Sequence, residues 1–447
     1  MATQNPVAGD GSFREEMLKI LLGAADSVKA RKCQAYSYTE HLIMGVERVI
    51  SESTTGRAFI QGAIESGRLG KLTFRTFFYA LESETRLEFL KKVSAKLIET
   101  HTPTLEDNLS DIPELDNFDV KIGDGHFHEH ATHEKKIDRR NYSVGHMYFM
   151  DAKTHLIRPV GMLKDSLGNK KKADIKLLQE HKNKLRFDAP FGRKVLIVYD
   201  RASIDFHLWW QLKKSKGVYF LSREKANMTL KDNIIGENEF DLSDPRNSGV
   251  VSDQICGCHA HVSIRRITYV DPETGNTFVF ITNEMTLPPG VVAFLYKLRW
   301  DIEKKFDFFK NALNEKKSWS KSLAGKKQQA LFLCIAHNLL TILQDLLARK
   351  HGISDRKCLE KRRRKIEEYK ENMKRKNQMI NPLIATLRKL SKFSLQFFRT
   401  IRMKYFSFSS WDAFIRDIRL STRQYFYQLS SHRSLQILNF QRTLEKY

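Results

Sequence analysis

The sequence has little cysteine, and its cysteines follow no disulfide pattern. Five cysteines occur in 447 residues, an odd number and mostly dispersed. Small disulfide-stabilised secreted domains carry an even, regularly spaced set, so that class is excluded and a reducing compartment is expected. Residues 1–13 are polar and have no apolar segment behind a basic start, so no secretory signal is expected.

A long uninterrupted apolar run is also missing. The most apolar stretch, residues 330–348, is interrupted by four polar side chains: His337, Asn338, Gln344 and Asp345. Such side chains are expensive in the hydrocarbon of a bilayer, so the stretch predicts a buried helix and no membrane partner.

Acidic residues are too few to balance the basic ones. The chain carries 76 Lys and Arg against 52 Asp and Glu, a formal net charge of +24. Its 41% hydrophobic and 11% aromatic residues are enough for a packed core, which excludes a disordered basic tail protein. A folded protein with this charge is expected to bind a polyanion, and without a membrane segment the polyanion is nucleic acid.

The first part of the chain, residues 1–112, is predicted to be a helical DNA-binding region. Residues 55–81 could form a unit like a helix-turn-helix, with four basic side chains available for phosphates: Arg57, Arg68, Lys71 and Arg75. An ordinary helical bundle with a solvated basic face is the alternative. Residues 101–118 are acidic and contain two prolines, which predicts a linker.

An α/β core with a mixed sheet is predicted for residues 113–222 and 291–350. Strands are expected at 118–124, 142–150, 155–162, 194–199 and 218–222, with helices at 173–181, 206–214 and 291–313. Residues 223–290 are rich in polar turns around β-type runs and predict a β-rich insertion. Residues 351–447 predict a basic helical region, whose run at 357–376 suits either DNA backbone contact or a solvated helix face.

Three acidic residues stand where an active site would form. Asp124 and Asp200 stand at the C-terminal ends of predicted strands, and sites in open α/β sheets lie at strand ends. Glu303 belongs to a set on one face of the 291–313 helix, spaced 3, 4 and 7 residues apart: Tyr296, Arg299, Glu303 and Lys310. Apolar residues cover the neighbouring stripe, so the helix is expected to pack while presenting a polar edge.

Three carboxylates suit a pair of Mg²⁺ ions that act on a phosphodiester. Arg299 would bind phosphate through two parallel N–H groups of its guanidinium, and Lys310 would bind it through the single charge of its ammonium group. The set Tyr296-x₂-Arg299-x₃-Glu303-x₆-Lys310 resembles the Y-R-E-K signature of bacterial insertion-sequence transposases, in the insertion-sequence-four family of DDE transposases. Residues 195–201 and 219–227 are similar to the same family, and the resemblance covers roughly residues 118–345.

The resemblance implies a ribonuclease H-like catalytic core with a β-rich insertion. It implies that Asp124, Asp200 and Glu303 bind two Mg²⁺ ions, with Mn²⁺ as a substitute, and that Tyr296, Arg299 and Lys310 contact double-stranded DNA at the element's ends. Such proteins cut at terminal inverted repeats and join the element to target DNA, as a homodimer in the synaptic complex. A cytoplasmic, nucleoid-associated protein of bacteria is therefore expected.

Two other functions remain open from the sequence. One is a non-catalytic DNA-binding regulator derived from a transposase. The presence of all three acidic residues, Asp124, Asp200 and Glu303, argues against it. The other is a nuclease of the same fold that needs no specific ends. The resemblance also implies that some members excise through a DNA hairpin, aided by an aromatic side chain in the insertion. No tryptophan lies between Trp210 and Trp300 in this chain, which speaks against the hairpin route without excluding it. The aromatic residues that could substitute there are Phe240, Tyr269 and Phe280.

Two clusters of potential metal ligands also stand out. His126, His128, His130 and His133 follow Asp124, at a spacing that suits either one strand face or a solvated loop. The second cluster is Cys256, Cys258, His259 and His261. Structural zinc sites usually draw ligand pairs from two separated segments, so a polar turn is the alternative for this cluster.

Overall fold

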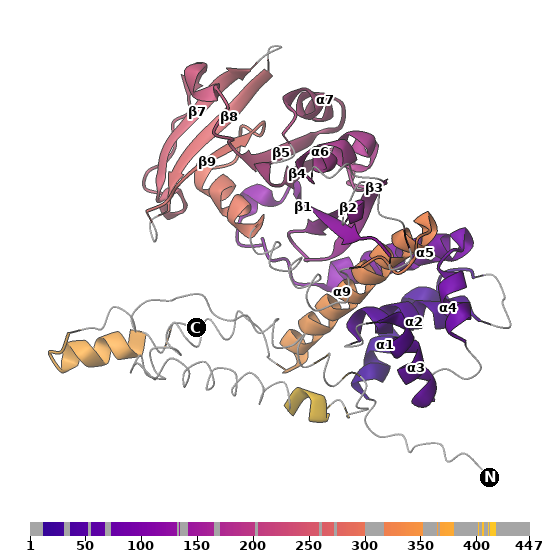
Figure 1. The fold of residues 1–447 in the computed structure, drawn as a ribbon. Coiled ribbons are helices and arrows are strands. Elements are labelled where there is room, and N and C mark those ends of the chain that lie inside the picture. Colours follow the sequence, from indigo (N-terminus) through magenta and orange to yellow (C-terminus); the bar gives the residue numbers. More distant parts are fainter. Residues whose placement is uncertain are drawn as a thin grey trace, which may run out of the picture. The chain divides into compact units, whose positions relative to one another are not determined.

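The computed structural model forms two compact units (Figure 1). One contains Met1–Val28, Ile50–Glu52 and Leu339–Tyr447, and the other contains Lys29–Val49 and Ser53–Asn338. Within these units the structure describes residues 12–30, 36–51, 55–67, 73–131, 134, 142–164, 170–201, 204–258, 262–271, 275–299, 317–351, 364, 367–379, 401, 405, 410 and 412–416.

Eight labelled α-helices have the following bounds: α1 Phe13–Asp26, α2 Tyr38–Ile50, α3 Gly56–Glu65, α4 Phe74–Ala80, α5 Glu84–His101, α6 Lys170–Glu180, α7 Phe206–Lys216 and α9 Leu323–His351. Residues 289–299 are also helical. Hydroxyl side chains fix several helix starts, because Thr55, Thr73 and Ser83 each accept a hydrogen bond from a backbone N–H of the first turn.

The strands are β1 Phe118–Glu129, β2 Tyr142–Asp151, β3 Ile157–Lys164, β4 Lys194–Val198, β5 Val218–Arg223, β6 Ile234–Glu237, β7 Val250–Cys258, β8 Val262–Val270 and β9 Thr277–Thr282. They form one sheet in the order β3-β2-β1-β4-β5-β9-β8-β7-β6. Strands β1, β4 and β5 are parallel neighbours, and the other pairs are antiparallel. The β-type runs predicted within residues 223–290 form strands β6–β9, which extend the same sheet from the edge of β5.

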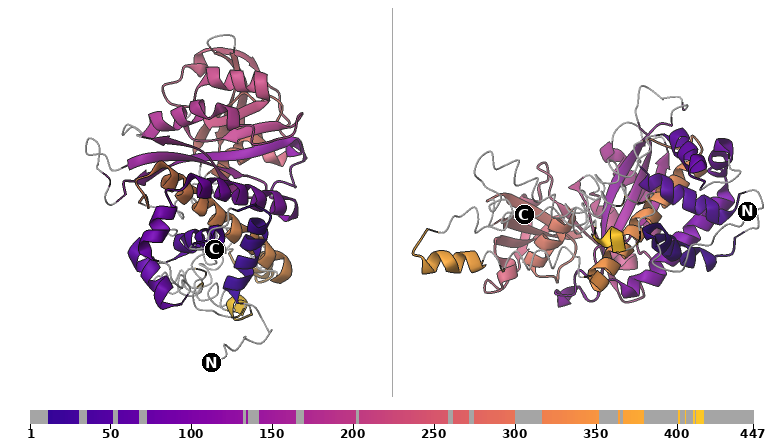
Figure 2. Two further views of the ribbon diagram at one scale, coloured as in Figure 1. Left: turned by 90° about the vertical axis from the view of Figure 1, so that its right-hand side faces the viewer. Right: turned by 90° about the horizontal axis from the view of Figure 1, so that it is seen from below.

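An apolar core lies on the face of the sheet that α6 and α7 cover (Figures 1 and 2). Side chains alternate along the strands, so Phe149 and Val195 face these helices while Tyr148 faces the opposite side. On that opposite side, the first half of α9 contacts the sheet. Asn338 of α9 accepts a hydrogen bond from the backbone N–H of Ile157 and donates one to its carbonyl.

The acidic stretch before β1 is not a free linker. Leu109 and Leu115 are buried in it, and Pro113–Leu115 forms a 3-10 turn, as does Thr102–Thr104. The backbone N–H of Asn108 donates to the carbonyl of Lys153 in the β2–β3 turn. These contacts hold the stretch against the sheet, which its acidic composition did not indicate. The helices α3 to α5 belong to the same compact unit as the sheet, and the functional division at residue 112 stays a prediction.

Helix α9 is the buried helix that the sequence predicted. Of the helices that the structure describes, it is the one long and apolar enough to span a membrane by length and composition. Its most apolar window is 78% buried inside the protein, as is common for the core helix of a soluble protein.

In the other unit, α1 begins with a capping box between Ser12 and Glu15. Its first residue, Phe13, stacks on Phe414 with ring centroids 4.0 Å apart and meets Tyr405 edge-on at 6.1 Å. Aromatic packing therefore joins the start of α1 to segments near the end of the described chain.

Candidate active site

Asp124 and Asp200 lie next to each other on the parallel strands at the middle of the sheet. Ile122 of β1 and Val198 of β4 are register partners. Asp124 lies two residues beyond Ile122, inside β1, which continues to Glu129, so the prediction that Asp124 ends a strand is wrong. Asp200 lies two residues beyond Val198, so the two aspartates occupy equivalent positions on the same face of neighbouring strands, which are about 4.8 Å apart.

The backbone around Asp200 is fixed by the strand before it and by the next strand. Strand β4 is buried from Val195 to Val198. Beyond its last residue, the N–H of Tyr199 donates to the carbonyl of Leu221 at 3.1 Å. The hydroxyl of Ser222 donates to the carbonyl of Asp200 at 3.1 Å. Strand-like pairing therefore continues to Asp200 and holds its backbone at the strand end.

Tyr296 and Arg299 lie on the helix of residues 289–299, close to Asp200. The Arg299 guanidinium lies over the Tyr296 ring, 5.3 Å from its centroid, and Phe280 contacts the same ring at 5.0 Å. Burial raises the pKa of Tyr296, the positive charges of Arg299 and Arg223 oppose that rise, and the Asp200 carboxylate adds to it. That electrostatic effect indicates that the helix lies near the strand end bearing Asp200.

The predicted exposed polar edge of this helix is wrong for its described part. Tyr296 is 3% exposed and Arg299 is 5% exposed, while Phe294, expected to pack, is 40% exposed. The ring of Tyr296 covers the Arg299 guanidinium, so the two polar side chains pack together in place of a solvated edge. Glu303 and Lys310 lie outside the described residues.

The donor chemistry fits a divalent metal as far as the structure describes it. Asp124 and Asp200 supply carboxylate oxygens, the ligands that Mg²⁺ prefers. Within the described ranges, no three His, Cys, Asp or Glu side chains are placed to hold one metal ion. The described part thus offers two of the three expected ligands.

Arg223 is a candidate that sequence reasoning missed. It ends β5, the parallel neighbour of β4, and its guanidinium lies over the Phe278 ring at 4.9 Å. Its charge also reaches Tyr296, since it lowers the pKa of that hydroxyl. The signal in the sequence was its position at the end of the strand after Asp200, where basic side chains meet the same edge of the sheet.

Of the histidines after Asp124, His126 and His128 belong to strand β1 and are buried, so the solvated-loop interpretation is wrong for these two, whereas His133 lies outside the described residues. Strand β1 continues to Glu129 and pairs His126 with His146 of β2. The ring centroids are 4.9 Å apart for His126 and His128, and 4.7 Å for His128 and His146. Burial, with Lys326 adding, lowers the pKa of His128 to about 3 and also lowers that of His146, so both rings are neutral.

The cysteine cluster of the insertion is described only in part. Cys256 is buried on β7 and Cys258 is half-buried at its end, while residues 259–261 lie outside the described chain. Burial raises the pKa of the Cys256 thiol. Of the three aromatic residues proposed to replace a tryptophan in the insertion, Phe280 contacts Tyr296 and is 3% exposed.

The basic regions predicted to contact DNA are partly visible. Helices α3 and α4 form the expected pair, with Arg57 and Arg75 exposed, while Arg68 and Lys71 lie outside the described residues. In the C-terminal run, residues 367–375 are helical and mostly exposed. Arg375 lies 4.0 Å from Glu371 there, so part of this charge is balanced along the helix.

Comparison with known proteins identifies one family and one relative. The family model described as "Transposase DDE domain" matches residues 107–339, just over half of the chain. A protein of Sinorhizobium fredii (strain NBRC 101917 / NGR234), described as "Putative transposase y4zB", is 26% identical over 167 residues. That match covers 35% of this chain and 46% of the relative, so the chain spans less than half of the relative's length. The sequence-predicted site residues all fall within 107–339.

Proposed function

The chain belongs to the family of DDE-domain transposases, and from this membership we propose that it cleaves DNA at the ends of an insertion sequence and joins them to target DNA. The observation that carries the proposal is the pair Asp124 and Asp200 at equivalent positions of adjacent parallel strands. Two carboxylates at one sheet edge are costly unless a cation is shared between them, so this placement is suited to a metal-dependent site.

We assign the metal ligands to Asp124, Asp200 and Glu303, the last on sequence grounds alone. When bound, two Mg²⁺ ions or Mn²⁺ in their place would activate the attacking oxygen and stabilise the leaving oxygen of a phosphodiester. The protein's own contribution is to fix the carboxylate of Asp124 on β1 and that of Asp200 just after β4. The hydrogen bond from Ser222 and the pairing of Tyr199 with Leu221 hold the backbone of Asp200 for this role.

Contact with the element's ends is assigned to Tyr296, Arg299 and Lys310, with Arg223 added from the structure. A guanidinium presents a planar fork that matches phosphate oxygens. Because Arg299 is buried over the Tyr296 ring, we infer that its contact with DNA requires the guanidinium to leave that ring. Arg223 is half-buried beside Phe278 and needs a smaller rearrangement.

The finer family assignment follows from the same residues. We propose membership of the insertion-sequence-four family and a ribonuclease H-like core made of β1–β5 with α6 and α7. The antiparallel strands β1–β3, followed by the parallel strands β4 and β5, support that core. Terminal inverted repeats, target DNA and a second copy of the chain in the synaptic complex are the expected partners, in the cytoplasm at the bacterial nucleoid.

The test is cleavage of labelled DNA carrying the terminal inverted repeats that flank the gene. Asp200→Asn should bind these ends as the wild type does but lose cleavage in Mg²⁺. The loss should exceed the roughly 10–100-fold cost of removing an outer-shell partner of a metal ligand. Asp205→Asn is the matched control, because Asp205 caps α7 through Leu208 and asparagine caps equally well.

Normal cleavage by Asp200→Asn would contradict the assignment of the metal ligands. Specific binding of the ends without any cleavage by the wild type, in Mg²⁺ or Mn²⁺, would favour the non-catalytic regulator. Cleavage of DNA that lacks the repeats, at an equal rate, would favour a nuclease without end specificity.

A further inference from the structure

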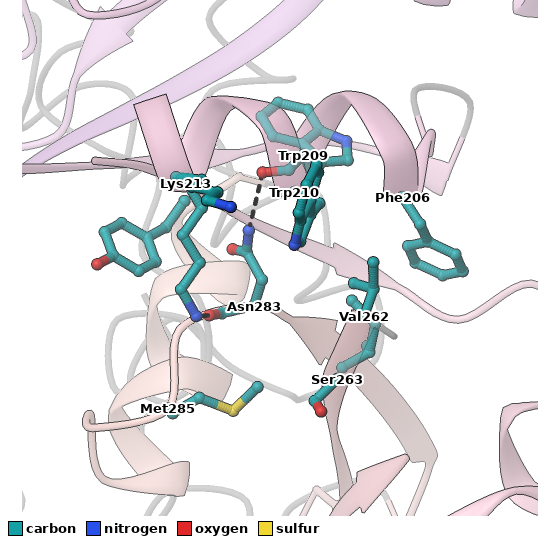
Figure 3. Close-up of a pocket in the computed structure, with 11 residues that line it drawn as sticks. Phe206, Trp209, Trp210, Lys213, Val262, Ser263, Asn283 and Met285 are labelled. Atoms are coloured by element: carbon teal, nitrogen blue, oxygen red, sulfur yellow. Dashed lines mark hydrogen bonds between the residues drawn. The ribbon is translucent and has the colours of Figure 1, made fainter. Parts of the chain in front are cut away.

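A cavity of about 540 Å³ lies between α7 and the start of β8 (Figure 3). Side chains of α7 line one wall, with Val262 and Ser263 across from them. The cavity lies beside Tyr219, near the beginning of β5, whereas Asp200 follows the end of the parallel strand β4. It is therefore a separate site from the candidate active site.

Aromatic rings make up much of the lining of this cavity. Its aromatic members are Phe206, Trp209, Trp210 and Tyr219. Trp210 is 38% exposed. Trp209 is fully buried and packs its ring against Tyr199 and Phe220, so Trp210 is the tryptophan whose ring is accessible at the cavity.

Two lysines give the cavity a positive charge. The ammonium of Lys214 lies over the Trp210 ring, 5.1 Å from its centroid. Lys213 lies 5.4 Å from the Tyr219 centroid and donates to the carbonyl of Asn283 at 2.6 Å. No acidic side chain is among the described lining residues. Glu284 lies nearby but is 1% exposed, and it accepts from the backbone N–H groups of its own turn.

We propose that this cavity binds an unpaired base of a DNA strand together with the adjoining phosphate. A base presents a planar surface that stacks on aromatic rings, and the phosphate matches the lysines. A simple inorganic anion would not need the rings, and an apolar peptide would not need the cations. The volume lies within the usual range of about 300–1,000 Å³ for small-ligand sites. The inference rests on the proposed action on DNA.

The test measures how tightly the full chain binds a fluorescent fifteen-nucleotide oligothymidylate. Binding is monitored by fluorescence anisotropy in the presence of EDTA. Base stacking on an aromatic ring contributes about 1–3 kcal/mol, so Trp210→Ala should weaken binding by about 5- to 150-fold. Trp210→Phe, which keeps a flat ring, should recover most of the loss. Lys214→Ala should lower the slope of log affinity against log salt by about 0.7.

Matched controls come from the same helix. Gln211→Ala alters an exposed neighbour of Trp210 outside the lining, and Lys216→Ala removes an ammonium that instead donates to Asn183. Both should bind as the wild type does. Equal binding by Trp210→Ala and the wild type, with Lys214→Ala also unchanged, would overturn the proposal. Competition by thymidine monophosphate at the oligonucleotide's own concentration would also overturn it, in favour of a free-nucleotide site.

The outcome is separable from that of the proposed function. EDTA removes the metal that the cleavage reaction needs, so binding at this cavity is read without the candidate active site. Asp200→Asn should bind the oligonucleotide as the wild type does. If Trp210→Ala weakens oligonucleotide binding but the wild type cleaves no DNA, the cavity proposal stands and the proposed function fails. If the wild type cleaves DNA but Trp210→Ala binds the oligonucleotide normally, only the cavity proposal fails.

Discussion

His41 of α2 links separate segments of the chain through one buried ring. Its Nε2 lies 2.6 Å from Oε1 of Gln328, which can only accept, so Nε2 is the donor. Its Nδ1, 3.3 Å from the Tyr36 hydroxyl, is then the acceptor. The amide nitrogen of Gln328 donates onward to carbonyls around the α4–α5 turn. A neutral imidazole satisfies this network, and the burial of the ring favours that form.

Acid should therefore weaken the fold through His41. Burial is the main cause that lowers its pKa to about 3, with Arg86 adding and the hydrogen bond to Gln328 opposing. The folded-state pKa lies below the unfolded value, so this stability is complete above about pH 6.5 and is lost as the pH falls towards 3. Between pH 6 and 4 the free energy of unfolding should fall by about 1.4 kcal/mol per pH unit through this group.

His41→Gln removes the titration and keeps a donor for Gln328. Urea unfolding of both proteins at several pH values gives the free energy of unfolding as a function of pH. The slope for the variant should be smaller by the amount that corresponds to about one proton. His207→Gln, on the exposed side of α7, is the control and should keep the wild-type slope. An identical slope for His41→Gln and the wild type would contradict the role of His41.

At the scale of elements, one amide fastens α9 to the edge strand β3. Both hydrogen bonds of the Asn338 side chain go to the backbone of Ile157, at 2.8 and 2.9 Å, and Asn338 is fully buried. Asn338→Ala would leave a buried N–H and a buried carbonyl without partners and should cost about 2–4 kcal/mol in the free energy of unfolding.

Chemical denaturation measures that cost. Asn233→Ala is a suitable control, because the exposed Asn233 amide donates to Thr229 over a longer 3.4 Å and its loss should change stability by under about 0.5 kcal/mol. If Asn338→Ala were as stable as this control, the amide would not be what fastens β3 to α9.

Most elements of the sheet could be predicted, because apolar runs bounded by turns are local signals. The β-type runs predicted within residues 223–290 are strands in the structure, among them β8 Val262–Val270 and β9 Thr277–Thr282. The length of β1 could not be predicted, because histidines look polar in sequence and become buried only when β2 and α9 cover them. The pairing of β9, the last strand of the insertion, with β5 could not be predicted either, because pairing between strands far apart in the sequence leaves no local pattern.

The candidate site divides in the same way. Asp200 could be placed at the end of β4 because that strand end is visible in the sequence, whereas Asp124 lies inside β1, which runs on to Glu129. The burial of Tyr296 and Arg299 could not be predicted, because it depends on Phe280, which reaches them from β9. Arg223 was missed for a similar reason, since its neighbours Phe278 and Tyr296 are distant in sequence. Helical spacing shows which residues share a face, but tertiary packing decides whether that face is exposed.

At the scale of the whole molecule, the chain combines a charge of +24 with candidate chemistry that depends on carboxylates. The positive charge suits a long-range attraction for DNA, which is sequence-independent and weakens with salt. Asp124 and Asp200, in contrast, contribute carboxylates, which suit cations. The account therefore assigns binding to the basic surface as a whole and bond breaking to a few acidic side chains.

The most direct test of this account is strand joining by the full chain. The substrate is a pre-cut element end with a free 3′-OH, mixed with a supercoiled plasmid in Mg²⁺. The account predicts a joined product with the wild type, and no product with Asp200→Asn or with an end that lacks the 3′-OH. Specific binding of the end by the wild type, without any joined product in Mg²⁺ or Mn²⁺, would contradict it.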